Sequence, residues 1–214
     1  MKRILSLALA LLMLLFAFSG CTKETDALIG TWEGELDDAA YLNQLIRTSY
    51  GEAMAQYWTI DSFPLPIVMT FREDGTYTQT VDQNKFAQSI ELLRQTLRKG
   101  LVEFIQDLID ASGEETTVDA VLESQGITVD SFLDEALSEE VINTIIADYT
   151  FEGKFDAKEG KLFTSAGPEF NIDESIYETY EVTEDTLTLQ SIVSGEDDAR
   201  LDEEHYPIVL KRAP

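Results

Sequence analysis

A repeated pattern of short β-rich runs separated by turn residues constrains this chain more than any other feature of its sequence. Residues 67–71 and 76–81 flank the pair Asp74-Gly75, and both runs are rich in β-branched and aromatic residues. Glycine supplies the positive φ that a tight turn requires, so Asp-Gly between two such runs is a strong hairpin signal. The pattern therefore predicts an antiparallel hairpin here.

The same pattern recurs twice in the C-terminal third, around turn residues 157–160 and 183–185. We expect eight strands in sequential antiparallel order, at residues 32–36, 67–71, 76–81, 151–156, 161–164, 177–182, 186–193 and 206–211. An open sheet of this kind leaves two unpaired edges, whereas closure pairs them. The expected fold class is α+β, with a small antiparallel up-and-down β-barrel formed by residues 28–82 and 149–214.

Two segments show helical rather than strand periodicity. Residues 37–58 place Leu42, Leu45 and Ile46 on one helical face, which predicts a helix between the first two strands. Residues 83–148 carry a long apolar stripe at helical spacing, followed by shorter amphipathic stretches. Because a structureless loop of this length is rare in a compact domain, we expect residues 83–148 to form a helical insertion between strands three and four.

The N-terminus has the three parts of a secretion signal. Lys2 and Arg3 precede an apolar run over residues 4–18, too short for a spanning helix, and Ser19 and Gly20 precede Cys21. Residues 18–21 resemble the bacterial lipobox, in which the cysteine takes up a diacylglyceryl group. The resemblance implies a signal peptide over residues 1–20, lipidation of Cys21, a tether over residues 21–27, and attachment to an extracytoplasmic membrane face of a bacterial cell envelope. Ordinary cleavage that leaves a free thiol is the alternative.

The charge balance is strongly acidic. The chain has 15 Lys and Arg against 41 Asp and Glu, a net charge of −26; loss of Lys2 and Arg3 with the signal leaves 13 minus 41, or −28. Such a surface repels phosphate backbones and anionic headgroups, so we expect no nucleic-acid partner and assign membrane attachment to the lipid on Cys21.

Few residues are candidates for catalysis or metal binding. His205 is the only histidine, and we expect it on the surface at the start of the last strand, because the sequence has no G-x-S-x-G, zinc-binding or Gly-rich phosphate-binding motif. Acidic clusters at residues 114–115, 139–140, 184–185, 196–198 and 202–204 are expected to be solvated surface charge. We therefore expect no catalytic residue, no metal and no cofactor.

Four aromatic residues, Tyr50, Tyr57, Trp58 and Phe63, gather between the expected first helix and second strand. Aromatic side chains dominate buried area, so core packing is the expected role. A pocket mouth at this place is the alternative.

Gly30-Thr31-Trp32 resembles the Gly-x-Trp signature that opens lipocalins, and the hairpin over residues 71–77 and the closing run 208–211 strengthen the resemblance. It covers the strand regions and skips the helices. The resemblance implies that Trp32 plugs the closed end of the barrel and that Lys211 or Arg212 lies across its ring in a cation–π contact.

An eight-stranded barrel can just hold one small ligand, so we expect a module that binds a small apolar or amphipathic molecule in the barrel interior, beneath a helical lid. A structural or protein-interaction lipoprotein, in which the helices contact an envelope protein, is the alternative. A hydrolase is a further, weaker alternative. An empty apolar interior favours binding, and a filled one favours interaction.

Overall fold

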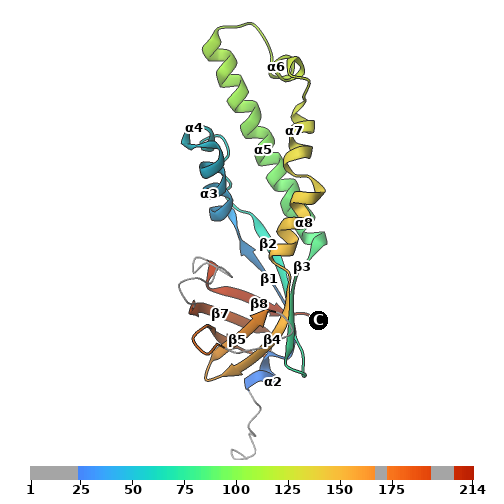
Figure 1. The fold of residues 1–214 in the computed structure, drawn as a ribbon, viewed down its shortest axis with the longest axis vertical. Helices are drawn as coiled ribbons and strands as arrows, with labels where there is room; N and C mark the ends of the chain where they lie inside the picture. Colours follow the sequence, from blue (N-terminus) through green and yellow to red (C-terminus); the bar gives the residue numbers. More distant parts are fainter. Residues whose placement is uncertain (1–23, 167–172, 194–204) are drawn as a thin grey trace, which may run out of the picture.

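A computed structural model describes residues 24–166, 173–193 and 205–214. It contains a closed antiparallel barrel of eight strands with a group of helices at one end (Figure 1). The predicted antiparallel barrel is therefore confirmed. All its strands lie between residues 30 and 212, so a chain that begins at residue 22 contains the whole barrel.

Each strand pairs with its neighbours in the sequence, and the last strand pairs with the first. The strands are β1 Gly30–Asp37, β2 Pro64–Phe71, β3 Thr76–Val81, β4 Phe151–Lys158, β5 Lys161–Ala166, β6 Tyr177–Val182, β7 Thr186–Val193 and β8 Ile208–Arg212. Closure is made by β1 and β8, where Trp32 lies opposite Arg212 and Glu33 opposite Lys211. The eight strands predicted from the alternating runs are all present.

The two ends of the barrel differ because antiparallel strands place successive connections at alternating ends. The turns after β2, β4 and β6 are short, with Gly75 at φ 78° and Gly160 at φ 71° in the left-handed region. We call this the closed end. The longer connections after β1, β3, β5 and β7 all leave from the other end, which we call the open end.

The barrel interior is filled by its own side chains. Inward-facing Leu65, Ile67, Leu162 and Leu187 are at most 2 % exposed, and Phe71 packs edge-on against another ring of the interior. The cavity that remains in the barrel measures about 50 Å³, which is room for water rather than for a ligand. The short strands carry large residues, so the described barrel interior offers little space for the ligand that we expected there.

At the closed end, Trp32 is fully buried and its indole Nε1 donates to the Leu28 carbonyl at 2.7 Å. The Arg212 guanidinium carbon lies 4.0 Å from the centre of the indole ring, and its nitrogens donate to the carbonyls of Ile29 and Ala27. Lys211, the other candidate for this contact, donates to Thr186 Oγ1 instead. The cation–π partner of Trp32 is thus Arg212.

A short helix, α2 Glu24–Leu28, covers the closed end next to β4 (Figure 1). The Glu24 carboxylate accepts from the Gly160 backbone N–H at 3.0 Å, and Leu28 is fully buried. Burial, the Glu24 charge and a hydrogen bond to Glu24 raise the pKa of Tyr180 to about 12. The predicted tether over residues 21–27 is corrected here, because its described part is a helix docked on the barrel. Cys21 and residues 1–20 lie outside the described residues.

The helices form a lobe at the open end. The connection after β1 carries α3 Ala39–Tyr50 and α4 Glu52–Ala55, and the one after β3 carries α5 Gln83–Ser112, α6 Val118–Ser124, α7 Val129–Ala136 and α8 Glu139–Asp148. The single helix expected over residues 37–58 is instead two, because the chain turns at Gly51 with φ 80°. None of the described helices combines the length and apolar character that a membrane crossing requires.

Helix α5 is the longest element of the lobe. Asp82 caps its first turn by accepting from the backbone N–H groups of Asn84 and Lys85, and Gly113 ends it in the left-handed conformation. Gly100 is a candidate kink site by its residue type, yet α5 continues through it. A Cβ at Gly100 would lie 2.1 Å from Trp58 Cδ1 and 2.2 Å from the Tyr57 carbonyl oxygen, so glycine is needed for close packing of Trp58.

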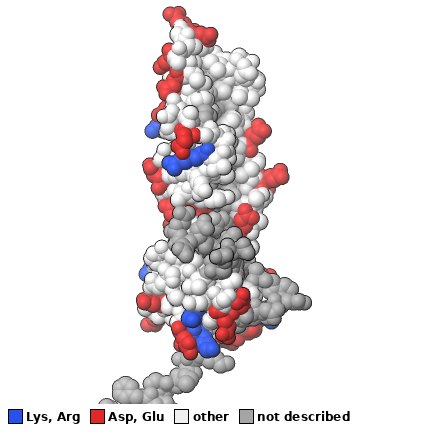
Figure 2. Space-filling model, turned by 60° about the vertical axis from the view of Figure 1, so that its left-hand side comes forward, with Lys and Arg blue, Asp and Glu red and all other residues white. Residues whose placement is uncertain are grey.

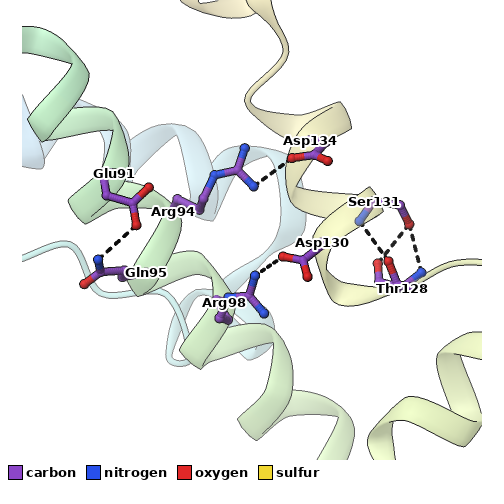
Figure 3. Close-up of polar contacts among 8 residues, drawn as sticks. All are labelled: Glu91, Arg94, Gln95, Arg98, Thr128, Asp130, Ser131 and Asp134. Atoms are coloured by element: carbon purple, nitrogen blue, oxygen red, sulfur yellow. Dashed lines mark hydrogen bonds and ion pairs between the residues drawn. The ribbon is translucent and has the colours of Figure 1, made fainter.

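Helix α7 packs against α5 (Figure 3). Arg94 of α5 pairs with Asp134 at 2.8 Å, and Arg98 pairs with Asp130. Asp130 and Asp134 are each 68 % exposed, so these pairs contribute about 0–1 kcal/mol each and mainly set the position of α7 along α5. Burial of Leu133, which is fully buried, supplies more stabilisation.

Candidate functional site

A cavity of about 1020 Å³ lies between the lobe and the open end of the barrel. Its walls come from α3, the segment before β2, α5, α7 and α8, and its floor is formed by residues next to strand ends, Asp38, Phe63, Tyr149 and Phe151, together with His205. We call it the lobe cavity. It is about twenty times larger than the 50 Å³ space inside the barrel.

The walls of the lobe cavity include apolar side chains that remain exposed on its helices. On α3, Tyr41, Leu45 and Tyr50 remain 51 %, 47 % and 55 % exposed, although each belongs to an amphipathic helix. On α8, no residue is buried, and Val141 is 40 % exposed. Water does not favour such faces, so the two helices present a surface suited to an apolar occupant.

Three of the four aromatic residues singled out in the sequence line this cavity. Tyr50 meets Trp58 edge-on at 5.2 Å, and Phe63 meets Phe86 in the same way at 5.9 Å. Trp58 and Phe63 are also core residues, at 4 % and 2 % exposure. Tyr57 lies elsewhere, against α5, where its hydroxyl donates to Asp107 at 2.7 Å. Core packing and a pocket therefore coexist in this cluster.

A buried carboxylate lies at the cavity floor. Asp38 is 4 % exposed, and its Oδ1 is 2.6 Å from His205 Nε2, while its Oδ2 accepts a short hydrogen bond from the Tyr149 hydroxyl. We call these three residues the Asp38 cluster. The expectation of a surface His205 is wrong, since its side chain is only 7 % exposed. The reason is a contact between residues 167 positions apart, which local sequence does not reveal.

The electrostatics of the cluster keep Tyr149 as a donor. Burial raises the pKa of the Tyr149 phenol, and the hydrogen bond to the Asp38 carboxylate raises it further. The phenol therefore stays protonated at any physiological pH and continues to donate to Asp38.

The neighbouring carboxylate, Asp37, fixes the edge of the floor. It accepts from the backbone N–H groups of Ala39 and Phe63 at 3.0 and 2.9 Å and from the Ser62 hydroxyl at 2.9 Å. Burial acts to raise the pKa of Asp37, but these hydrogen bonds and the nearby His205 outweigh it, so the pKa is lowered. Asp37 thus stays ionised and ties the segment before β2 to the start of α3.

A side-chain amide holds the same segment against α3. Asn43 donates to the Ile60 carbonyl at 2.8 Å and accepts from the Ile60 backbone N–H at 2.9 Å. This two-way bond replaces the pairing that an extended segment would find in a sheet. One wall of the cavity is therefore held in place by polar contacts from its outer side.

The acidic clusters at residues 114–115, 139–140 and 184–185 are exposed. Among the described residues, no group of three or more His, Cys, Asp and Glu side chains is placed to hold a metal ion. The clusters at residues 196–198 and 202–204 lie outside the described residues, as does Cys21.

The sequence pattern does not reveal the Asp38 cluster. Asp38 lies at the start of the helix predicted over residues 37–58, Tyr149 belongs to no recognisable motif, and His205 is expected on the surface. A buried contact between the end of β1, the segment after α8 and the segment before β8 could be found only once the barrel brought these ends together.

Comparison with protein-family models gives no match for this chain, and comparisons with curated proteins and with solved structures give none.

Proposed function

We propose that this chain is the precursor of a bacterial envelope lipoprotein that binds a small apolar or amphipathic ligand in the lobe cavity. The observation that carries this proposal is the cavity of about 1020 Å³ walled by the apolar faces of α3 and α8. Ligand sites are typically concave, mostly apolar and supplied with a few polar groups that fix orientation. The Asp38 cluster is such a polar group at the floor.

The proposed anchor and the cavity lie at opposite ends of the molecule. Helix α2 begins three residues after Cys21 and covers the closed end, whereas the lobe extends from the open end (Figure 1). With lipid on Cys21, the closed end would face the bilayer and the cavity would point away from it. Helix α5, with 30 residues, would carry the lobe about 45 Å further from the membrane at 1.5 Å per residue.

The proposal retains the resemblance to lipocalins for the barrel and changes the place of the ligand. In this reading, the barrel is a filled base with Trp32 and Arg212 at its closed end, and the helical insertion between strands three and four supplies the binding site. Support comes from the different amounts of free space, about 50 Å³ in the barrel and about 1020 Å³ under the lobe.

We propose a binding role rather than a catalytic one. The sequence has none of the nucleophile or zinc motifs that a hydrolase of a common class carries. Both oxygens of Asp38 already hold partners, Tyr149 and His205, which suits a fixed polar floor. Screening of esterase and glycosidase substrates would test this, and turnover that is lost in Asp38→Asn would support a hydrolase instead.

The binding role is tested by occupying part of the cavity. Ala136 lines the cavity and is exposed on α7, so Ala136→Trp should place an indole in this space without disturbing the core. We expect it to reduce the fluorescence enhancement of Nile red, a neutral apolar dye, and the amount of any ligand seen by native mass spectrometry. The matched control is Ala147→Trp on α8, where Ala147 is exposed and is not part of the cavity lining. Equal Nile red binding by both variants would contradict the proposal.

An interaction lipoprotein is the second candidate, because the barrel interior is filled. Leu92 and Leu108 on α5 are 55 % and 54 % exposed and could contact an envelope protein. Photo-crosslinkers at these two positions in intact cells should then capture one reproducible envelope protein. Capture that is no greater than from a crosslinker at exposed Glu152 of the barrel would count against this function.

A further inference from the structure

We infer that the ligand of the lobe cavity is a cationic amphiphile, with an amine head at the Asp38 cluster and an apolar body along α3 and α8. This inference rests on the proposed function and names the chemical class that the same cavity would select. It follows from the negative charges of the lining, the hydrogen-bonding capacity of the Asp38 carboxylate and the negative net charge of the whole chain.

The described lining of the cavity carries only negative fixed charges. Its ionisable side chains with fixed charge are Asp38, Glu140 and Asp148, and His205 is the one basic group; no Lys or Arg occurs among the lining residues that the structure describes. The formal charge of this lining is −3 with His205 neutral and −2 with His205 protonated. A carboxylate or phosphate head would therefore be repelled, whereas an ammonium head would be attracted.

The nearby arginines do not offset this charge. Arg94 and Arg98 lie on α5, but each is paired with an aspartate of α7 (Figure 3). Arg47 of α3 lies 3.9 Å from the Glu52 carboxylate. A fatty-acid head would have to break one of these pairs to bind any of these three described arginines, which makes an anionic ligand less favourable there.

Asp38 has room to accept a further hydrogen bond. Each oxygen of an ionised carboxylate has two lone pairs, and in this structure Oδ2 accepts from Tyr149 while Oδ1 lies beside His205. A charge-assisted hydrogen bond from an ammonium group is about twice as strong as a neutral one, and burial of Asp38 protects it from solvent screening. Asp38 is thus the position in the cavity where a cationic head gains most.

Aromatic rings provide further stabilisation for a cation. Tyr41, Tyr50 and Trp58 all line the cavity. The faces of tyrosine and tryptophan rings attract ammonium groups, and methylated amines are commonly bound by such rings together with carboxylates. The same rings offer apolar area to the body of the ligand, so they suit an amphiphile whose head is positively charged.

The negative charge of the whole protein also favours a cationic ligand. Acidic side chains are scattered over both the lobe and the barrel on the mostly uncharged face shown in Figure 2, with few basic ones among them. The nine residues that precede His205 in the sequence, 196–204, contain six carboxylates and one arginine, so this stretch is also acidic wherever it lies. A net charge of −26 attracts cations over a distance of about one Debye length, which is roughly 8 Å at physiological salt.

The test compares three probes that share one alkyl chain: decylamine, 1-decanol and decanoate. Binding to the acyl-free chain that begins at residue 22 is measured by calorimetry at pH 7. We expect decylamine to bind most tightly, 1-decanol more weakly and decanoate least. Raising the salt concentration should weaken decylamine binding and leave 1-decanol unchanged.

Variants locate the head group. Asp38→Asn should weaken decylamine binding about ten-fold, the size of one charge-assisted hydrogen bond, and weaken 1-decanol binding less. Glu140→Gln should weaken it less, about two- to three-fold, because Glu140 is exposed and screened. Glu139→Gln is the matched control, since Glu139 is the exposed neighbour of Glu140 on α8 but does not line the cavity, and it should have no effect.

The outcomes separate this inference from the proposed function. Decanoate or 1-decanol binding as tightly as decylamine would overturn the cationic head and leave a ligand-binding cavity. Failure of all three probes, together with no Nile red signal, would overturn the binding function itself. Circular dichroism shows whether Asp38→Asn folds. If it does not, the double variant Glu140→Gln/Asp148→Asn tests the inference instead, because both residues are exposed and can be changed without loss of the fold. Unchanged decylamine binding in the double variant would reject the inference.

Discussion

Each end of the barrel has a buried tryptophan, but the surroundings of the two rings differ. At the closed end, Trp32 is fully buried, its ring is covered by Arg212, and the backbone carbonyls around it are bound by the guanidinium. At the open end, Trp58 is almost as buried, yet it borders a cavity of about 1020 Å³ beside exposed Tyr50. At the closed end, Arg212 covers the ring and binds the neighbouring carbonyls. At the open end, apolar side chains remain exposed in the described chain.

This difference suggests that one end of the molecule contributes mainly to stability and the other mainly to binding. The closed end and barrel interior are packed, which stabilises the fold, while the lobe retains free space and helix faces that a ligand would cover. Substitutions at the two ends should therefore affect different measurements.

The largest effect is expected at the closed end. Trp32→Ala removes a fully buried indole, its hydrogen bond to the Leu28 carbonyl and its contact with Arg212. We expect a loss of about 3–5 kcal/mol in the free energy of unfolding, measured by urea denaturation. A loss below about 1 kcal/mol would show that the closed end does not determine the stability of the barrel.

The second-largest effect on stability is expected at the close contact between Gly100 and Trp58 in the lobe. Gly100→Ala places a Cβ 2.1 Å from Trp58 Cδ1, so Trp58 or α5 must move. We expect a loss of about 1–3 kcal/mol in the free energy of unfolding and, because Trp58 lines the cavity, a change in Nile red binding. Lys99→Ala, an adjacent change of a side chain that is 77 % exposed, serves as control and should shift stability by less than about 0.5 kcal/mol.

A smaller, pH-dependent effect is expected at the edge of the floor. The pKa of Asp37 in the folded protein lies below its ordinary value of 3.8, so its hydrogen bonds contribute stability at neutral pH that is lost as the pH falls through the folded pKa. Asp37→Ala should cost about 1 kcal/mol at pH 7, close to the usual value for a lost cap, and the difference from the wild type should vanish under strongly acidic conditions. Thermal melts across pH would check this; a difference that grows on acidification would contradict it.

The smallest effect on stability should accompany a clear effect on binding. Leu45 of α3 lines the cavity and is 47 % exposed, so Leu45→Ala removes little packing within the protein. We expect a change in unfolding free energy within about 0.5 kcal/mol and weaker binding of Nile red or decylamine. Loss of stability without loss of binding would mean that the open end is an ordinary part of the core.

Much of the fold could be predicted from local patterns. The hairpins around Asp74-Gly75 and the two C-terminal turns were visible because turn chemistry and period-2 alternation depend on neighbouring residues. Helix α5 was visible from its apolar stripe for the same reason, although its expected length was shorter than the 30 residues observed. The single helix over residues 37–58 was wrong because an exposed glycine, Gly51, ended it early.

The candidate site could not be predicted in the same way. His205 was expected on the surface because no catalytic or zinc-binding motif surrounds it, but the barrel brings it to Asp38, which also binds Tyr149. The barrel interior was expected to hold a ligand, but whether a barrel is hollow depends on how the side chains of opposite strands fill it. Neither outcome is a property of any one segment.

The sequence by itself determined the antiparallel strand order, the acidic charge and the amphipathic helices, because periodicity, turn residues and charge are local or additive. Only the tertiary structure decided that the barrel is filled and that free space lies beneath the lobe with a buried carboxylate at its floor. The physical reason is that cavities and buried polar clusters arise from distances between residues far apart in the chain, and those distances exist only after β8 has closed the barrel against β1.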